Sequence, residues 1–119
     1  MSKIVVIGAS LNPSRYSHQA VSLLSEKGYD VIAIGRKDGQ IGDVQIHQDQ
    51  IDLDEVDTIS LYLSPQIQAQ YHDYIKMLGA RRIIFNPGTE NPEFQQELVD
   101  EGVDAFEACT LVMLRTGQF

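Results

Sequence analysis

The sequence predicts an α/β fold: a doubly wound parallel sheet of about five strands with helices on both faces. Three observations lead to this prediction. The 119 residues, 43% of them apolar, have the length of a single domain, residues 1–119, with one core. The strand-like segments are continuous apolar runs, as in sheets that are covered on both faces. Helix-like segments separate these runs, which favours right-handed parallel crossovers.

Strands are predicted wherever apolar residues run without interruption. The expected strands cover residues 3–8, 30–35, 57–63, 82–86 and 103–107. The stretch 36–55 is predicted to be irregular, with a short strand near 44–46.

Helices are predicted between the strands, where apolar residues recur with helical spacing. The expected helices cover residues 14–27, 65–78 and 92–101, with a short terminal helix near 110–115. The stripes expected to face the core are Tyr16, Ala20, Leu23 and Leu24, then Ile67, Tyr71, Ile75 and Leu78, then Phe94 and Leu98. Ser64 and Asn91 each precede a proline, which is typical of an N-cap residue followed by proline at the first helical position. Gly28, Gly79 and Gly102 are expected to end the three helices. This succession of elements is that of a Rossmann-like domain.

Charge is distributed unevenly along the chain. Nine basic and 17 acidic residues give a net charge of −8, which argues against general nucleic-acid binding because phosphate backbones need a basic surface. Residues 1–37 nevertheless carry five basic and two acidic residues, a net +3, whereas residues 38–119 carry −11. No apolar run is long enough to cross a bilayer, no signal peptide is evident, and Cys109 is the only cysteine. We therefore expect a cytoplasmic protein with no disulfide and no membrane partner.

The first loop contains the residues best suited to a ligand. It follows the first strand, at the edge where open parallel sheets bind ligands. Gly8 permits a tight turn, Ser10, Ser14 and Ser17 supply hydroxyl groups, and Arg15 supplies a fixed, forked positive charge. Free N–H groups at the start of the following helix also favour anions. The loop is therefore predicted to bind phosphate.

Two features separate this loop from common nucleotide motifs. The dinucleotide fingerprint has glycine at its first, third and sixth places, where this chain has Gly8, Ser10 and Pro13, and the Gly-Lys-Ser/Thr of a P-loop does not occur. An NAD site also has an acidic residue after the second strand. Arg36 and Lys37 stand there instead, which favours a ligand with a phosphate on its ribose, such as NADP or coenzyme A (CoA).

The opening of the chain resembles a known family. Residues 6–17 read Val-Ile-Gly-Ala-Ser-x-x-Pro-x-Arg-x-Ser, and a helix and Gly-Tyr-Asp-Val-Ile follow. This pattern looks like that of the small bacterial CoA-binding-domain proteins, which resemble the nucleotide-binding lobe of the succinyl-CoA synthetase alpha subunit. Comparable segments at Ser64-Pro65, 86–91 and 107–110 extend the resemblance over essentially the whole chain. The chain departs from the family after the second strand, where relatives often have Val-Asn-Pro and this chain has residues 34–37, Ile-Gly-Arg-Lys.

The resemblance implies binding of CoA or an acyl-CoA, with the ADP part over the first loop. Carried over by position, the residues around the pyrophosphate are Gly8, Ser10, Arg15 and Ser17, with Ala9 and Pro13 in the same motif. Arg36 and Lys37 fall where the family's second-strand loop contacts the nucleotide. The adenine or pantetheine wall would be formed by Leu63, Ser64 and Pro65.

Two later segments are less specific. The segment 86–89 is either an ordinary turn or a contact to the pantetheine arm, made by Asn86 and Thr89. The predicted cofactor-binding residues include Asn86 and Gly88 from this segment. Cys109 is either a small buried residue or a thiol that forms a mixed disulfide with CoA. The three histidines have no metal-ligand spacing, so no metal site is expected.

The predicted function is non-catalytic binding of CoA or an acyl-CoA, as in a sensor or carrier. The partners expected besides this ligand are further copies of the chain in a homo-oligomer, or a partner enzyme of which the chain is a subunit. The chain offers no nucleophile–base pair, and 119 residues leave no room for the catalytic parts of succinyl-CoA synthetase. Two alternatives stay open, an NADP(H)-binding oxidoreductase-like domain and a ligand-free interaction module. The first shares the basic end of the second strand, but the glycine fingerprint and a Tyr-x-x-x-Lys pair are missing.

Overall fold

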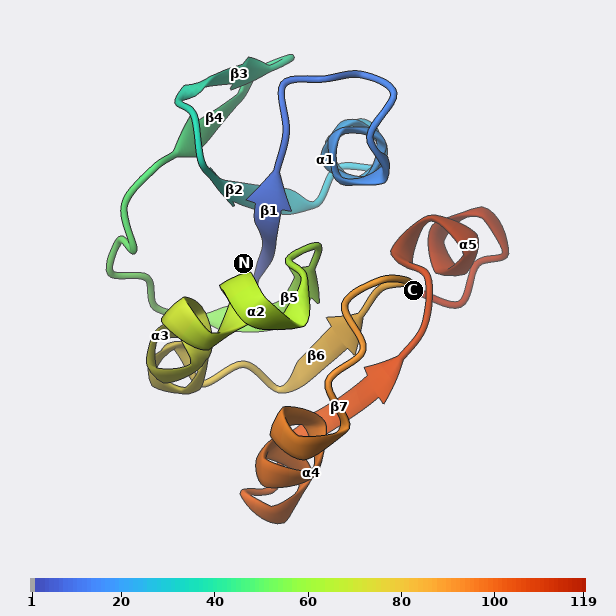
Figure 1. Ribbon diagram of the computed structural model, residues 1–119. Coiled ribbons are helices and arrows are strands. Elements are labelled where there is room, and N and C mark those ends of the chain that lie inside the picture. Colours follow the sequence, from blue (N-terminus) through green and yellow to red (C-terminus); the bar gives the residue numbers. More distant parts are fainter. Residues whose placement is uncertain (1) are drawn as a thin grey trace.

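A seven-stranded sheet forms the centre of the protein, with helices against both of its faces (Figure 1). The computed structural model describes residues 2–119. In chain order the strands are β1 (Lys3–Ala9), β2 (Asp30–Gly35), β3 (Gly39–Ile41), β4 (Val44–His47), β5 (Val56–Leu61), β6 (Arg82–Phe85) and β7 (Asp104–Glu107). The helices are α1 (Tyr16–Glu26), α2 (Pro65–Gln68), the 3-10 turn η1 (Ala69–Tyr71), α3 (His72–Leu78), α4 (Pro92–Asp100) and α5 (Thr110–Arg115).

The sheet is parallel except at one edge. The order is β3-β4-β2-β1-β5-β6-β7, and only β3 and β4 pair antiparallel. The predicted number of about five strands is wrong, because β3 and β4 form a hairpin within residues 36–55. The short strand expected near 44–46 is present as β4, whereas β3 was not predicted. Ile41 and Ile46 anchor this hairpin in the core, at 3% and 0% exposure. Strands of three and four residues are too short to give a clear periodic signal.

The two faces of β1 belong to two separate cores. Val5 and Ile7 join a cluster that α3 and α4 cover, whereas Ile4 and Val6 join a cluster that α1 and α5 cover. All four side chains are at most 3% exposed. This confirms the prediction that the continuous apolar strands are buried on both faces, since alternate residues of a strand point to opposite sides.

The order of the strands reverses beside β1. From β1 the chain passes through α1 to β2 on one side, while β5, β6 and β7 lie on the other side. The pairing of β1 with β5 continues one step further, because the N–H of Tyr62 donates to the carbonyl oxygen of Ile7 at 2.8 Å. Connections from four strands therefore leave the carboxyl edge of the sheet around this point, which is where sheets of this kind bind ligands.

The buried face of α1 differs from the predicted one. Its buried residues are Ser17, Ala20, Val21 and Leu24, whereas Tyr16 is 62% exposed. The observed set follows the spacing i, i+3, i+4, i+7 of a helical stripe, and the small Ser17 and Ala20 let the first turns approach the sheet. The prediction that Tyr16 packs in the core is therefore wrong.

The predicted helix over 65–78 is divided into α2, η1 and α3. The tighter turn of η1 changes which residues point inward. Ile67 is 36% exposed instead of buried, while the polar Gln68 is 0% exposed. Further along, Ile75 and Leu78 are buried in α3, as predicted.

The amino end of α4 agrees with the sequence. The Oδ1 of Asn91 accepts a hydrogen bond from the N–H of Phe94 at 3.3 Å, as an N-cap residue does. Phe94 and Leu98 are the buried residues of this helix, which confirms the predicted face. Ser64 occupies the N-cap position of α2, but its side chain makes no capping hydrogen bond within residues 2–119.

Candidate functional site

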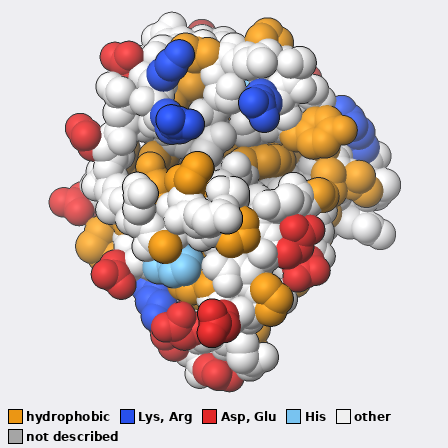
Figure 2. Space-filling model, viewed as in Figure 1, with side chains coloured by type: hydrophobic (Ala, Val, Ile, Leu, Met, Phe, Trp, Pro, Cys, Tyr) orange, Lys and Arg blue, Asp and Glu red, His pale blue; other side chains and the backbone are white. Residues whose placement is uncertain are grey.

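A groove of about 1110 Å³ lies on the carboxyl edge of the sheet, where the strand order reverses. It is lined by segments that follow β1, β2, β5 and β6. The lining residues are Gly8, Ala9, Ser10, Leu11, Asn12, Ser14, Arg15, Tyr16, Ser17, Arg36, Lys37, Tyr62, Leu63, Ser64, Ile67 and Pro87. Figure 2 shows this face hollowed near its centre, with Lys and Arg side chains above the hollow.

Gly8 brings the first loop against the end of β5. Its φ angle is 99°, which favours glycine. A Cβ atom at this position would lie 2.9 Å from the backbone carbonyl carbon and oxygen of Tyr62. Gly35 has a similar part on the other side of β1, where a Cβ would overlap the carbonyl oxygen of Ala9. The base of the groove is therefore backbone packed on backbone.

Hydrogen bonds hold the first loop in one shape. The Oγ of Ser10 accepts from the N–H of Asn12 at 3.1 Å, and the Oδ1 of Asn12 accepts from the N–H and hydroxyl of Ser14 at 3.1 and 2.8 Å. The Nδ1 of His18 donates to the carbonyl oxygen of Ser10 at 3.0 Å. The N–H of Arg15 donates to the carbonyl oxygen of Asn12 at 3.0 Å. The loop therefore reaches α1 with its backbone already ordered.

The amino end of α1 borders the groove without a side-chain cap. Arg15 occupies the N-cap position and, in the described part of the chain, no side chain caps the first turn and no acidic residue lies in it. The free N–H groups and the helix dipole together favour an anion at this end. The guanidinium of Arg15 adds a full positive charge beside them.

The charged side chains that line the groove are all cationic. Among residues 2–119, none of Arg15, Arg36 and Lys37 is in a salt bridge or donates a side-chain hydrogen bond, and the groove lining includes no acidic residue. By contrast, Lys76 and Arg81 are paired with carboxylates. The three groove cations are therefore available to an anionic ligand.

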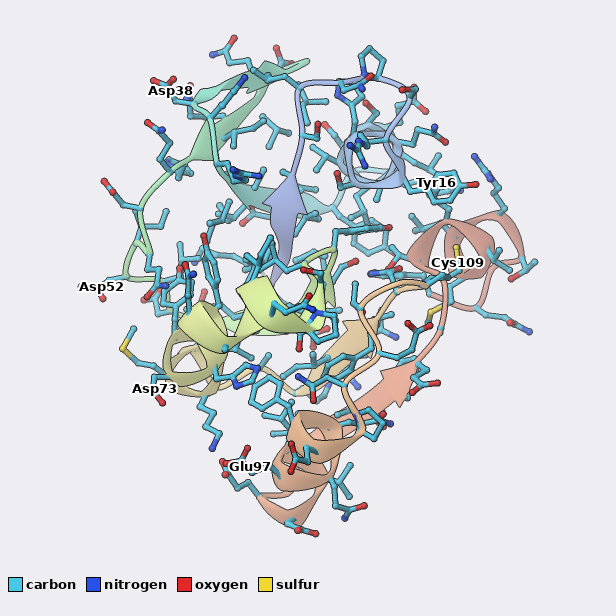
Figure 3. All side chains as sticks on the ribbon, in the orientation of Figure 1. Tyr16, Asp38, Asp52, Asp73, Glu97 and Cys109 are labelled. Atoms are coloured by element: carbon cyan, nitrogen blue, oxygen red, sulfur yellow. The ribbon has the colours of Figure 1, made fainter. Side chains whose placement is uncertain are left out.

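Apolar side chains form much of the remaining lining. Leu11 and Tyr16 are 42% and 62% exposed, and Leu63, Ile67 and Pro87 lie on the wall that follows β5 and β6. Figure 3 shows Tyr16 and Asp38, the residue after Lys37, on opposite sides of the upper part of the molecule. The groove thus combines positive charge at two places, beyond β2 and at the amino end of α1, with apolar surface along the wall that follows β5 and β6.

Tyr62 is one of the lining residues, but its hydroxyl is buried. Within the described residues this hydroxyl has no hydrogen-bond partner. Burial raises the pKa of Tyr62 to about 12. The phenol therefore stays neutral and protonated at physiological pH.

The structure brings most of the predicted site residues together. Those that line the groove are Gly8, Ala9, Ser10, Arg15, Ser17, Arg36, Lys37, Leu63 and Ser64. Those outside its lining are Pro13, Pro65, Asn86 and Gly88. The sequence did not single out Leu11, Asn12, Tyr16, Tyr62, Ile67 and Pro87 as site residues. Most of these are direct neighbours of predicted residues, but the helical spacing of Tyr16 and Ile67 predicts that both face the core, whereas both line the groove.

Asn86 is fully buried beneath the groove rather than open to it. Its Nδ2 donates to the Oγ of Ser60 at 2.9 Å and to the carbonyl oxygen of Leu61 at 2.8 Å. Its Oδ1 accepts from the N–H of Thr110 at 2.8 Å. The side chain thereby joins β5, the end of β6 and the start of α5, and a direct contact with a ligand stays a prediction.

We expect Asn86→Ala to lower the free energy of unfolding by about 2 kcal/mol, because it leaves buried polar groups unpaired. Urea unfolding followed by circular dichroism measures this change. Asn12→Ala, which removes the hydrogen bonds to the exposed Ser14, serves as the control and should cost clearly less. Equal losses in both variants would contradict the structural role given to Asn86.

The remaining candidate residues lie away from the groove. Cys109 is half-buried at the N-cap position of α5 (Figure 3) and is not part of the groove lining. His72 stacks on Phe94 with ring centroids 3.7 Å apart, and burial lowers the pKa of its imidazole. Within residues 2–119, His, Cys, Asp and Glu side chains form no group of three that could hold a metal ion, and no helix is long and apolar enough to cross a bilayer.

Solved structures share this fold over the whole chain. A protein described as uncharacterized is 39% identical, with a TM-score of 0.95, and the match covers 100% of this chain and 98% of that one. A conserved hypothetical protein from Pyrococcus furiosus is 25% identical, with a TM-score of 0.81 and coverage of 94% and 98%. No curated protein matches the sequence significantly.

A larger enzyme contains the same fold as one part. The dinucleotide-forming acetyl-coenzyme A synthetase 1 of Ca. Korarchaeum cryptofilum, solved with phosphate and ADP, is 19% identical with a TM-score of 0.71. The match covers 92% of this chain and 26% of that enzyme. The family model described as the CoA binding domain matches residues 2–115 of this sequence. The chain therefore belongs to the family of CoA-binding domains.

Proposed function

We propose that the groove binds CoA or an acyl-CoA along the carboxyl edge of the sheet. The 3′-phosphate of the ribose lies at Arg36 and Lys37, and the pyrophosphate lies at the first loop and the amino end of α1. The pantetheine arm then crosses the switch point toward Leu63 and Pro87. The single observation that carries this proposal is the set of three cations, unpaired within residues 2–119, that line the groove together with a helix start that no described side chain caps.

The phosphate part of the proposal is supported by charge. CoA carries phosphates at two places, on the ribose and in the pyrophosphate. Arg36 and Lys37 follow β2 and Arg15 precedes α1, so the groove also offers positive charge at two places. Each charge-assisted hydrogen bond contributes about 1.5–3 kcal/mol, so two or three of them decide the affinity.

The arm of the ligand is proposed to follow the apolar wall. Leu63, Ile67 and Pro87 offer contact to the methyl and methylene groups of pantetheine, and Ser64 offers a hydroxyl. The role we propose is binding without a chemical step, as in a sensor or carrier. Acetyl-CoA incubated with the protein should keep its thioester, which chromatography of the mixture measures.

Calorimetric titration with CoA, acetyl-CoA, NADP and NAD tests the function. We expect CoA and acetyl-CoA to bind and NAD to bind far more weakly, because NAD lacks a ribose phosphate for Arg36 and Lys37. NADP is the second candidate, because the same two cations suit its 2′-phosphate. Binding of NADP but not CoA would replace the proposal, and binding of none of the four would favour an interaction module.

Arg15→Ala is expected to weaken CoA binding about tenfold, equivalent to about 1.4 kcal/mol for one charged contact. The side chain is exposed and unpaired within the described residues, so the fold should not depend on it. Lys27→Ala, which removes an exposed cation outside the groove, is the control and should leave the affinity unchanged. An unchanged affinity in Arg15→Ala would remove this residue from the site.

A further inference from the structure

One buried side chain, Gln68 at the end of α2, stabilises the wall of the groove that follows β5 and β6. Gln68 is 0% exposed. Its Nε2 donates to the carbonyl oxygens of Leu63 at 3.0 Å and Thr89 at 2.7 Å. Its Oε1 accepts from the Nδ2 of Asn91 at 3.2 Å. One amide group thus joins the segment after β5, the loop after β6 and the N-cap of α4.

These hydrogen bonds fix the two parts of the wall relative to each other. Leu63 lines the groove, and Pro87, two residues before Thr89, lines it as well. Thr89 donates its N–H and its hydroxyl to the carbonyl oxygen of Asn86 at 3.0 and 2.7 Å, so the loop between them is itself closed. Both N–H groups of the Gln68 amide are used, and losing either would leave a buried carbonyl unpaired. The separation between Leu63 and Pro87 therefore depends on Gln68.

We infer that Gln68 is a positioning residue that sets the selectivity of the groove for ligands that carry a pantetheine arm. This inference rests on the proposed function. Gln68 does not line the groove, so it acts through Leu63 and Pro87. The groove cations belong to other segments, which follow β1 and β2, and make no hydrogen bond with this amide. Loss of the amide therefore loosens the wall for the arm and leaves the phosphate contacts in place.

Gln68→Met tests this, because methionine has a similar length and no amide. The wild-type protein and the variant are titrated with CoA and with adenosine 3′,5′-bisphosphate, which keeps the 3′-phosphate and one 5′-phosphate of CoA but has no arm. The expected result is a loss of about tenfold in affinity for CoA and no change for the bisphosphate. Gln95→Met is the matched control, because Gln95 donates to the carbonyl oxygen of Ala105 at 3.1 Å, away from the groove, and should change neither affinity.

A second variant keeps the test valid where Gln68→Met does not fold. Asn91→Asp retains an oxygen to cap α4 but removes the donor to the Oε1 of Gln68, and we expect a smaller, selective loss of about threefold for CoA. Equal losses for both ligands, or no loss for either, would overturn the positioning role. If the wild-type protein binds neither ligand, the proposed function fails as well. If it binds the bisphosphate as tightly as CoA, the nucleotide site stands and the role of Gln68 is overturned.

Discussion

Replacing Arg36 and Lys37 together by alanine is expected to weaken CoA binding about thirtyfold and to leave the affinity for dephospho-CoA nearly unchanged. Both side chains are exposed and line the groove beyond β2. Two charge-assisted contacts to the 3′-phosphate, reduced by solvent screening, contribute about 2 kcal/mol together. Calorimetric titration of the wild-type and variant proteins with both ligands measures the difference.

The control for this prediction is Lys27→Ala combined with Arg81→Ala. It changes the net charge by the same amount, but Lys27 follows α1 and Arg81 precedes β6, at the opposite edge of the sheet. We expect this control to leave the affinities for CoA and dephospho-CoA unchanged. It should lower the free energy of unfolding slightly, because Arg81 pairs with Asp57. A loss in Arg36→Ala/Lys37→Ala that is equally large for dephospho-CoA would contradict the assignment of these cations to the 3′-phosphate.

Gly8→Ala is expected to lower the free energy of unfolding by about 3 kcal/mol and to reduce CoA binding in the protein that still folds. A φ angle of 99° is unfavourable for any residue with a Cβ atom, and this Cβ would also meet the backbone of Tyr62 at 2.9 Å. The first effect costs about 1–2 kcal/mol and the second a similar amount. Urea unfolding measures the stability, and titration with CoA measures the binding.

Gly28→Ala separates the two effects. Gly28 has a φ angle of 87°, but a Cβ there would meet nothing within 4 Å. Its substitution should therefore show the conformational cost alone, about 1–2 kcal/mol, with CoA binding preserved. Equal losses of stability in the two glycine variants would contradict the prediction that the backbone of Tyr62 leaves no room for a Cβ atom at Gly8.

The part of the site that could be predicted depends on topology rather than on side-chain packing. Residues 8–17 and the pair Arg36 and Lys37 are distant in sequence, but each follows a parallel strand. Since the carboxyl ends of parallel strands share one edge, the alternation of strands and helices was sufficient to bring them together. Residues of both segments line the same groove.

The rest depended on details that periodicity does not encode. The apolar Ile67 is exposed and the polar Gln68 is buried, the reverse of what their residue types predict, because the 3-10 turn after α2 changes the direction of the helix. Tyr16 is exposed because the stripe in α1 runs through Ser17 instead. Strand β4 was expected near 44–46, but β3, with only three residues, was not, and tertiary contacts at Ile41 and Ile46 stabilise the hairpin that the two strands form.

The central position of β1 has a consequence for how the site responds to a ligand. This strand is hydrogen-bonded on both sides and buried between both cores, so its amide protons should exchange with solvent only when the whole domain opens. The first loop continues directly from its last residues. A ligand arriving there meets backbone that is rigid before binding, and little of its interaction energy is lost to restricting a mobile segment.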